Sequence, residues 1–113
     1  MLTTSTVPFY VQPLTNHYAN RRERVEMHVS PEAKHLVPKP AYGHRIGVTV
    51  SIGNRDYRGG LRTFQDRTYL CSNLRRASDN KPAKLADLLN DIGVRPRDQI
   101  SVRINAGKWT ITT

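Results

Sequence analysis

Residues 46–64 have the sequence IGVTVSIGNRDYRGGLRTF. The first seven positions alternate apolar side chains with small or polar ones, and a period of two indicates a half-buried strand. Gly53 and Asn54 follow as a two-residue turn, and residues 56–64 then return as the second strand of a hairpin. This stretch therefore predicts a protein built mainly from β-sheet.

The return strand has two chemically different faces. Arg58 and Arg62 share one face and lie roughly 13 Å apart, from the rise of four strand residues. Tyr57 and Leu61 occupy the opposite face. The adjacent glycines Gly59–Gly60 predict a bulge or the close approach of another backbone.

One helix is indicated at about residues 81–92. Its apolar positions recur at helical spacing and form a single stripe, which consists of Leu85, Leu88, Leu89 and Ile92. Residues 78–80 offer capping side chains, and Pro82 suits a first helical turn. Gly93 supplies a left-handed stop.

The remaining strand signals are shorter. Residues 68–71 predict one strand, and residues 100–104 and 109–111 predict a final hairpin. Residues 1–44 contain two short alternating segments but also five prolines, which disfavour helices and central strands. We therefore expect a single domain of residues 1–113, in which residues 1–44 are an irregular N-terminal part with short strands or an arm and residues 45–113 form the barrel core.

A single short helix cannot cover a sheet of this size, so the sheet must curl on itself. The expected fold class is mainly β: a small barrel or pseudobarrel of about five to seven strands with one helix.

The charge balance is strongly basic. The chain has 18 Lys and Arg against 9 Asp and Glu, a net charge of +9 and a pI of about 10.3. Arginine, which outnumbers lysine, presents a planar fork that suits phosphate oxygens and guanine edges. We expect a nucleic-acid partner, with DNA favoured over RNA and double-stranded DNA favoured over other forms.

The expected contact residues lie on the return strand and in the loop after it. They are Arg55, Arg58, Arg62, Arg67, Arg75 and Arg76. Arg21, Arg22 and Arg24 could extend this surface as an arm. A third group of cations lies near the helix stop and consists of Arg95, Arg97 and Arg103. Cations at a helix C-terminus stabilise the helix dipole, so this group has a structural explanation as well as a ligand-binding one.

Motifs for cofactor, metal or nucleophilic chemistry are absent from the sequence. There is no glycine-rich phosphate loop, no paired Cys-x-x-Cys and no His-Glu-x-x-His. The nearest approach to a metal cluster is His28, Glu32 and His35, which lacks further ligands. We therefore assign no cofactor, metal or catalytic residue, and lean against an enzyme.

Two alternatives to DNA binding stay open. A small metal-independent ribonuclease toxin could place cations and weak acids around a phosphate, and the candidates near the basic hairpin are His44, Arg45, Tyr57, Arg58 and Tyr69. An interaction or inhibitor protein could instead bind an acidic partner through the same arginines.

Cys71 is the only cysteine, so it fits a small buried side chain in a reducing compartment better than a disulfide framework. The first residues do not have the pattern of a secretion signal, and no apolar run approaches the roughly 20 residues that span a membrane. We expect a cytoplasmic protein, associated with the nucleoid if it binds DNA, and no membrane partner.

The C-terminal segment resembles the bacterial swapped-hairpin and pseudobarrel proteins that include AbrB-type regulators. The resembling runs are Leu85-Ala86-Asp87-Leu88-Leu89, Ile92-Gly93-Val94-Arg95-Pro96-Arg97-Asp98, residues 100–104 and residues 107–111. That family has glycine where this chain has Arg97. Residues 47–70 are similar to the pseudobarrel DNA-binding domains of some restriction enzymes.

The resemblance implies a small barrel from a bacterium or phage, often one that binds DNA. A half-barrel of the AbrB type would require a homodimer, whereas a complete pseudobarrel would be a monomer.

Overall fold

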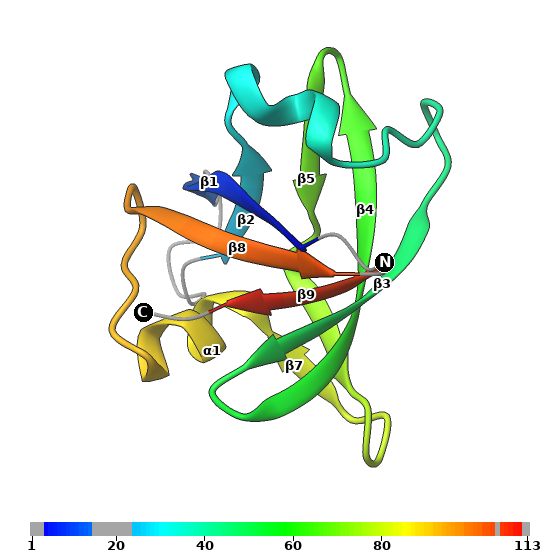
Figure 1. Ribbon diagram of the computed structural model, residues 1–113. Coiled ribbons are helices and arrows are strands. Elements are labelled where there is room, and N and C mark those ends of the chain that lie inside the picture. The colour runs from blue at the N-terminus through cyan, green and yellow to red at the C-terminus, as the bar shows by residue number, and fades with distance from the viewer. Residues whose placement is uncertain (1–3, 15–23, 106, 112–113) are drawn as a thin grey trace.

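A computed structural model describes residues 4–14, 24–105 and 107–111 (Figure 1). The strands are β1 (Thr4–Leu14), β2 (Arg24–Val29), β3 (Ile46–Ile52), β4 (Arg55–Phe64), β5 (Arg67–Leu70), β6 (Asn73–Arg76), β7 (Pro82–Lys84), β8 (Gln99–Asn105) and β9 (Lys108–Ile111). A 3-10 helix, η1 (Pro31–Leu36), follows β2, and the α-helix α1 (Leu85–Asp91) follows β7.

Seven of these strands close into a barrel. Their order is β3-β9-β8-β1-β2-β5-β4, and β3 also pairs with β4 along its whole length. The β3–β9 contact is parallel, while the other pairs in the ring are antiparallel. Strands β6 and β7 extend the sheet beyond β4. The predicted small barrel with one α-helix is confirmed, and strands of one chain suffice to close it.

The N-terminal part is more regular than the sequence indicates. β1 pairs with β8 on one side and β2 on the other, so it belongs to the ring and not to an arm. Its prolines are tolerated because of where their nitrogens point. Pro13 shares the edge of Val11, on which pairing with β8 ends at Tyr10. Pro8 lies where the β2 ladder ends, and its carbonyl accepts a hydrogen bond from the Ser30 N–H at 3.0 Å although its own nitrogen donates none.

The hairpin of β3 and β4 forms as predicted, but it contains no bulge. The register runs without interruption from Ile46 opposite Leu61 to Ile52 opposite Arg55. Side chains, and not another backbone, approach the two glycines. A Cβ atom on Gly59 would lie 2.7 Å from Leu74 and 2.9 Å from Leu70 in the core.

The barrel interior is filled by the apolar residues that alternate along the strands. Trp109 and Phe9 are buried, and their ring centroids lie 5.1 Å apart at an interplanar angle of 58°. Leu85 and Leu89 of α1 are buried with them. The apolar stripe predicted for the helix is therefore the face that packs on the core.

The helix begins later than the sequence indicates. Residues 82–84 pair with β6, and the residues expected to cap the helix form the turn between the two strands, where Asp79 Oδ1 accepts a hydrogen bond from the Lys81 N–H at 3.1 Å. Strand pairing therefore overrides the local helix signal. At the other end the stop is as predicted. Gly93 has φ of 83°, and Val94 donates to the Leu89 carbonyl at 2.9 Å, as in a Schellman motif.

Arg97 has an unusual backbone conformation. Its φ is 74°, in the left-handed region that favours glycine. Its N–H donates to the Val11 carbonyl at 2.8 Å, and Asp98 Oδ2 accepts from the Arg95 N–H at 2.8 Å. These bonds hold an arginine where the resembling proteins have glycine.

Candidate nucleic-acid interface

A cationic groove of about 820 Å³ lies on the outside of the barrel, and we call it the arginine groove. Its walls come from β2, β4, β5, β6 and β7 and from residues just outside the strands. Six cations line it: Arg24, Arg45, Arg58, Arg62, Arg75 and Lys84. The same lining contains one carboxylate, Glu26, so the groove has a strong positive potential.

Strand pairing brings the central cations together. Arg58 and Arg62 point outward from β4, as the alternation of their strand predicts. Arg58 lies directly opposite Arg75 of β6. Like charges directly opposite each other destabilise a sheet, so this pair costs stability that an anionic ligand would recover.

Arg45 reaches the groove because Gly60 lacks a side chain. The Nε, Cδ and Cζ atoms of Arg45 occupy the space that a Cβ on Gly60 would fill. Gly60 lies on the face of β4 between Arg58 and Arg62. The guanidinium of Arg45 therefore lies over the strand, between these two arginines.

The groove cations are not neutralised by the carboxylates that the structure describes. Within residues 4–14, 24–105 and 107–111, none of the six forms an ion pair. Arg75 Nη1 donates a hydrogen bond to the Asn80 carbonyl at 3.0 Å. This bond orients the side chain without cancelling its charge. By contrast, Arg76 lies 3.5 Å from Asp79 and Lys108 lies 3.7 Å from Asp56.

The structure separates the arginines predicted from sequence. Arg58, Arg62 and Arg75 meet in the arginine groove. Arg55 and Arg76 line a different hollow beside Tyr57, because they follow the alternation of the inward-facing residues. Arg67 lines two further hollows next to His28. Arg21 and Arg22 lie outside the described residues.

Sequence reasoning did not place the other three groove cations beside Arg58, Arg62 and Arg75. Arg45 was named only as a ribonuclease candidate, since its route over Gly60 depends on tertiary structure. Lys84 was placed in a helix that does not extend so far. Arg24 was expected in an arm with Arg21 and Arg22, and the structure places it on β2, whose position next to β5 could not be inferred from local patterns.

A second set of polar side chains adjoins the groove. On β2, His28 Nε2 lies 3.0 Å from Glu26 Oε1. The His28 ring stacks on Tyr69 of β5, with centroids 5.0 Å apart and an interplanar angle of 15°. Strand pairing continues this row to Arg62 of β4, which lies opposite Tyr69. We call Glu26, His28 and Tyr69 the acid–histidine–tyrosine cluster.

The ribonuclease candidates named from sequence only partly meet. Arg45, Arg58 and Tyr69 line the arginine groove. Tyr57 is buried and borders the separate hollow of Arg55 and Arg76, not the arginine groove. His44 is exposed in the loop before β3 and is not part of the groove lining.

Cys71 is half-buried in the groove wall. Burial raises the pKa of the Cys71 thiol above its ordinary value of 9.0, although the nearby Arg62 and Arg45 act in the opposite direction. A raised pKa leaves little thiolate at neutral pH. This fits the predicted role of a small, unreactive side chain.

We expect iodoacetamide to alkylate Cys71 of the folded protein slowly at neutral pH. The rate should increase with pH and reach half of its maximum above pH 9. Mass spectrometry of the alkylated fraction across pH would measure this, with protein in urea as the unfolded reference. Because the unfolded thiol ionises first, stability should also begin to fall as pH rises through 9.0. A folded-state midpoint below that of the unfolded protein would show that the arginines outweigh burial.

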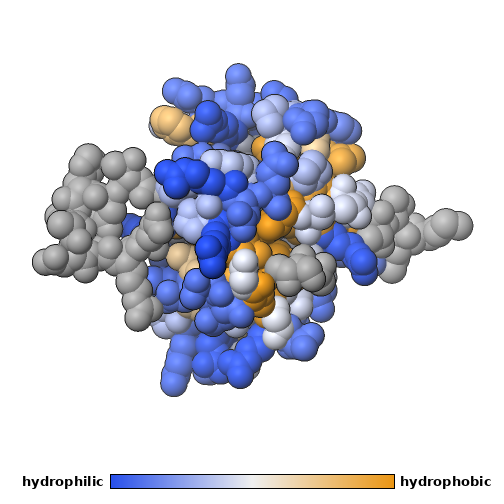
Figure 2. All heavy atoms as spheres, turned by 90° about the vertical axis from the view of Figure 1, so that its left-hand side faces the viewer, coloured by the Kyte–Doolittle hydropathy of each residue, from blue (hydrophilic) through white to orange (hydrophobic). Residues whose placement is uncertain are grey.

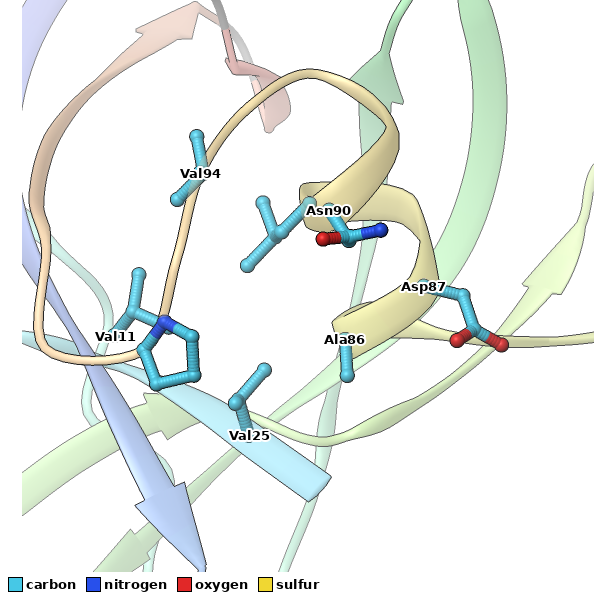
Figure 3. Close-up of a pocket in the computed structure, with 8 residues that line it drawn as sticks. Val11, Val25, Ala86, Asp87, Asn90 and Val94 are labelled. Atoms are coloured by element: carbon cyan, nitrogen blue, oxygen red, sulfur yellow. The ribbon is translucent and has the colours of Figure 1, made fainter. Parts of the chain in front are cut away.

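A smaller hollow of about 220 Å³ lies between α1, the ends of β1 and β2, and the loop after the helix (Figure 3). Val11, Val25 and Val94 face into it, while the Asp87 carboxylate points away from it (Figure 3). Its apolar lining does not suit a phosphate.

Seen from the left-hand side of Figure 1, the surface carries a band of apolar residues between polar ones (Figure 2).

In the part of the chain that the structure describes, histidines and carboxylates do not gather into a metal-binding cluster. No three His, Cys, Asp or Glu residues there are arranged to hold a metal ion. His28 instead faces Glu26, and His35 is exposed on η1. Neither described helix has the length and hydrophobicity that a membrane-crossing helix needs.

Comparison with known proteins found no family model, no curated protein and no solved structure that matches the chain. The case for function therefore depends on the chemistry of the groove.

Proposed function

We propose that this protein binds nucleic acid along its phosphate backbone in the arginine groove, and that double-stranded DNA is the ligand the charge pattern favours. The observation that supports this most is the gathering of six cations around one hollow without ion pairs to the described carboxylates. A ligand with regularly spaced negative charges would relieve their mutual repulsion.

Phosphate contacts would supply most of the affinity in this arrangement. Each guanidinium can donate two parallel hydrogen bonds to one phosphate, and each contact releases counterions from the nucleic acid. Arg58, Arg62 and Arg75 are extended from strands, so they offer such contacts from a rigid base. One or two of them could also reach a guanine edge, which would add sequence preference.

Fluorescence anisotropy with a labelled duplex, the matching DNA strand and the matching RNA strand tests this proposal across a range of salt concentrations. We expect binding that weakens steeply with salt. If four to six of the groove cations contact phosphates, the slope of log affinity against log salt should be about −4 to −5 for the duplex. Absence of binding to all three ligands at low salt, or affinity independent of salt, would contradict the proposal. Binding of an acidic protein alone would favour the inhibitor alternative.

A further inference from the structure

The acid–histidine–tyrosine cluster opens onto the arginine groove. This arrangement places groups that can transfer protons next to the cations that would bind a phosphate. Glu26 and Tyr69 line the groove itself, and Glu26, His28 and Tyr69 together line an adjoining hollow. From these contacts we infer that the protein cleaves RNA without a metal ion, by transfer of the phosphodiester to the neighbouring 2′-hydroxyl. The inference depends on the proposed function, because RNA must first occupy the groove.

The presence of Glu26 is difficult to explain by binding alone. A carboxylate inside a phosphate-binding groove repels the ligand. If Glu26 served to neutralise the arginines, its carboxylate would lie within ion-pair distance of one of them. Among the described residues it instead meets His28, at 3.0 Å. This arrangement leaves the arginines available to the ligand and holds one carboxylate in a fixed position beside them.

His28 positions Glu26. An ionised carboxylate can only accept hydrogen bonds, so His28 Nε2 carries the proton in this pair. His28 Nδ1 is buried and has no partner among the described residues. His28 Nε2 therefore donates to Glu26 Oε1, and the side chains of His28 and Glu26 are 14% and 20% exposed. The structure gives the second carboxylate oxygen no hydrogen-bond partner among the described residues, so it can accept a proton from a substrate.

Tyr69 supplies the complementary group. Its ring is fixed by stacking on His28, and its strand neighbour is Arg62. Burial, followed by the charge of Glu26, raises the pKa of the Tyr69 hydroxyl above its ordinary value of 10.0. The hydroxyl therefore keeps its proton at neutral pH and can donate it to an oxygen.

The reaction requires nothing that RNA and these residues do not provide. Glu26 accepts the proton of the 2′-hydroxyl, and the 2′-oxygen forms a bond to phosphorus. The bond between phosphorus and the 5′-oxygen breaks, and Tyr69 donates its proton to that leaving oxygen. Arg45, Arg58 and Arg62 face the negative charge that develops on the phosphate. The products are a 2′,3′-cyclic phosphate and a 5′-hydroxyl, and water returns the proton from Glu26 to Tyr69.

The test uses the full chain, with EDTA present, and two RNA probes of one sequence. One is ordinary RNA, and the other carries 2′-O-methyl groups, which block the attacking hydroxyl but keep the phosphates. We expect the wild-type protein to bind both and to cleave only ordinary RNA, leaving a 2′,3′-cyclic phosphate that mass spectrometry identifies. DNA of the same length should compete with cleavage but stay intact, because it lacks the 2′-hydroxyl.

The E26Q variant separates catalysis from binding. We expect its cleavage rate to fall about a hundredfold or more, the range for loss of a general base, while its affinity for 2′-O-methyl RNA is kept or increased. The matched control is D91N, which removes the same charge from an exposed position at the end of α1. It should cleave at the wild-type rate, which would show that the E26Q loss depends on the position of Glu26 and not on the change in net charge.

The outcomes distinguish this inference from the proposed function. Tight, salt-dependent binding of 2′-O-methyl RNA without cleavage of ordinary RNA would overturn the inference and leave the binding proposal intact. Equal cleavage by E26Q and wild type would also overturn it. If neither RNA probe nor DNA binds, both proposals are wrong.

Discussion

Replacing Arg58 and Arg62 together with alanine is expected to weaken nucleic-acid binding about a hundredfold at moderate salt, since each charge-assisted phosphate contact contributes roughly 1.5 kcal/mol or more. The two side chains extend from the same face of β4 into the arginine groove, on either side of Arg45. The loss of two phosphate contacts should also reduce the magnitude of the salt slope by about 1.4 to 1.8. Fluorescence anisotropy across salt concentrations measures both quantities.

The control is a double variant that removes two charges from elsewhere, Arg95→Ala with Arg103→Ala. Both residues are exposed and neither lines the groove. Net charge falls equally in the two double variants, so a difference between them reports position and not overall charge. Equal loss of affinity in both would show that binding is diffuse, and an unchanged salt slope in the Arg58 and Arg62 variant would place the interface elsewhere.

Fold class was accessible from the sequence because its signals are local and repeated. The alternation in residues 46–52 and the turn at Gly53–Asn54 define one hairpin without any knowledge of the rest of the chain. The stripe of α1 and the left-handed stop at Gly93 are equally local. By contrast, the ring depends on β1 between β8 and β2, and on β3 beside β9, which are contacts between distant segments.

Local signals failed where tertiary pairing competed with them. Pro82 fits a first helical turn, but residues 82–84 gain strand hydrogen bonds to β6 and delay the helix. The prolines of β1 suggest an irregular segment, and only the positions of β8 and β2 show that the missing donors fall where the ladders to these two strands end. A proline has no backbone N–H to donate, and the position of the neighbouring strand determines whether a ladder hydrogen bond is lost.

The candidate site shows the same division. Alternation along β4 was sufficient to place Arg58 and Arg62 together, and it should also have separated Arg55 from them. The contribution of Arg45 depends on an empty space above Gly60, and that of Glu26 and His28 depends on β2 pairing with β5. No spacing in the sequence connects residues 26 and 28 with residue 69. Groups that meet across strands become visible only when the strand order is known.

The adjacent glycines Gly59 and Gly60 should respond to alanine in opposite ways. Gly59 faces the core, where a new Cβ would lie 2.7 Å from Leu74 and 2.9 Å from Leu70. We expect Gly59→Ala to lower the free energy of unfolding by about 1–3 kcal/mol, the usual cost of overpacking a core. Gly60 faces the groove, where the new Cβ would displace only the flexible side chain of Arg45. Gly60→Ala should leave stability nearly unchanged and weaken nucleic-acid binding severalfold.

Urea unfolding and anisotropy on the same preparations would test this pair of effects, and Gly47→Ala is the control. Gly47 lies directly opposite Gly60 in the β3–β4 ladder, and a Cβ there would meet no atom within 4 Å. Alanine at Gly47 should therefore affect neither stability nor binding by much, because it changes strand composition at the same ladder position without moving Arg45. If Gly60→Ala binds as tightly as Gly47→Ala, Arg45 does not contact the ligand and the groove acts through Arg58, Arg62 and Arg75. If Gly60→Ala instead unfolds as easily as Gly59→Ala, the space above Gly60 serves packing of the sheet and not the binding surface.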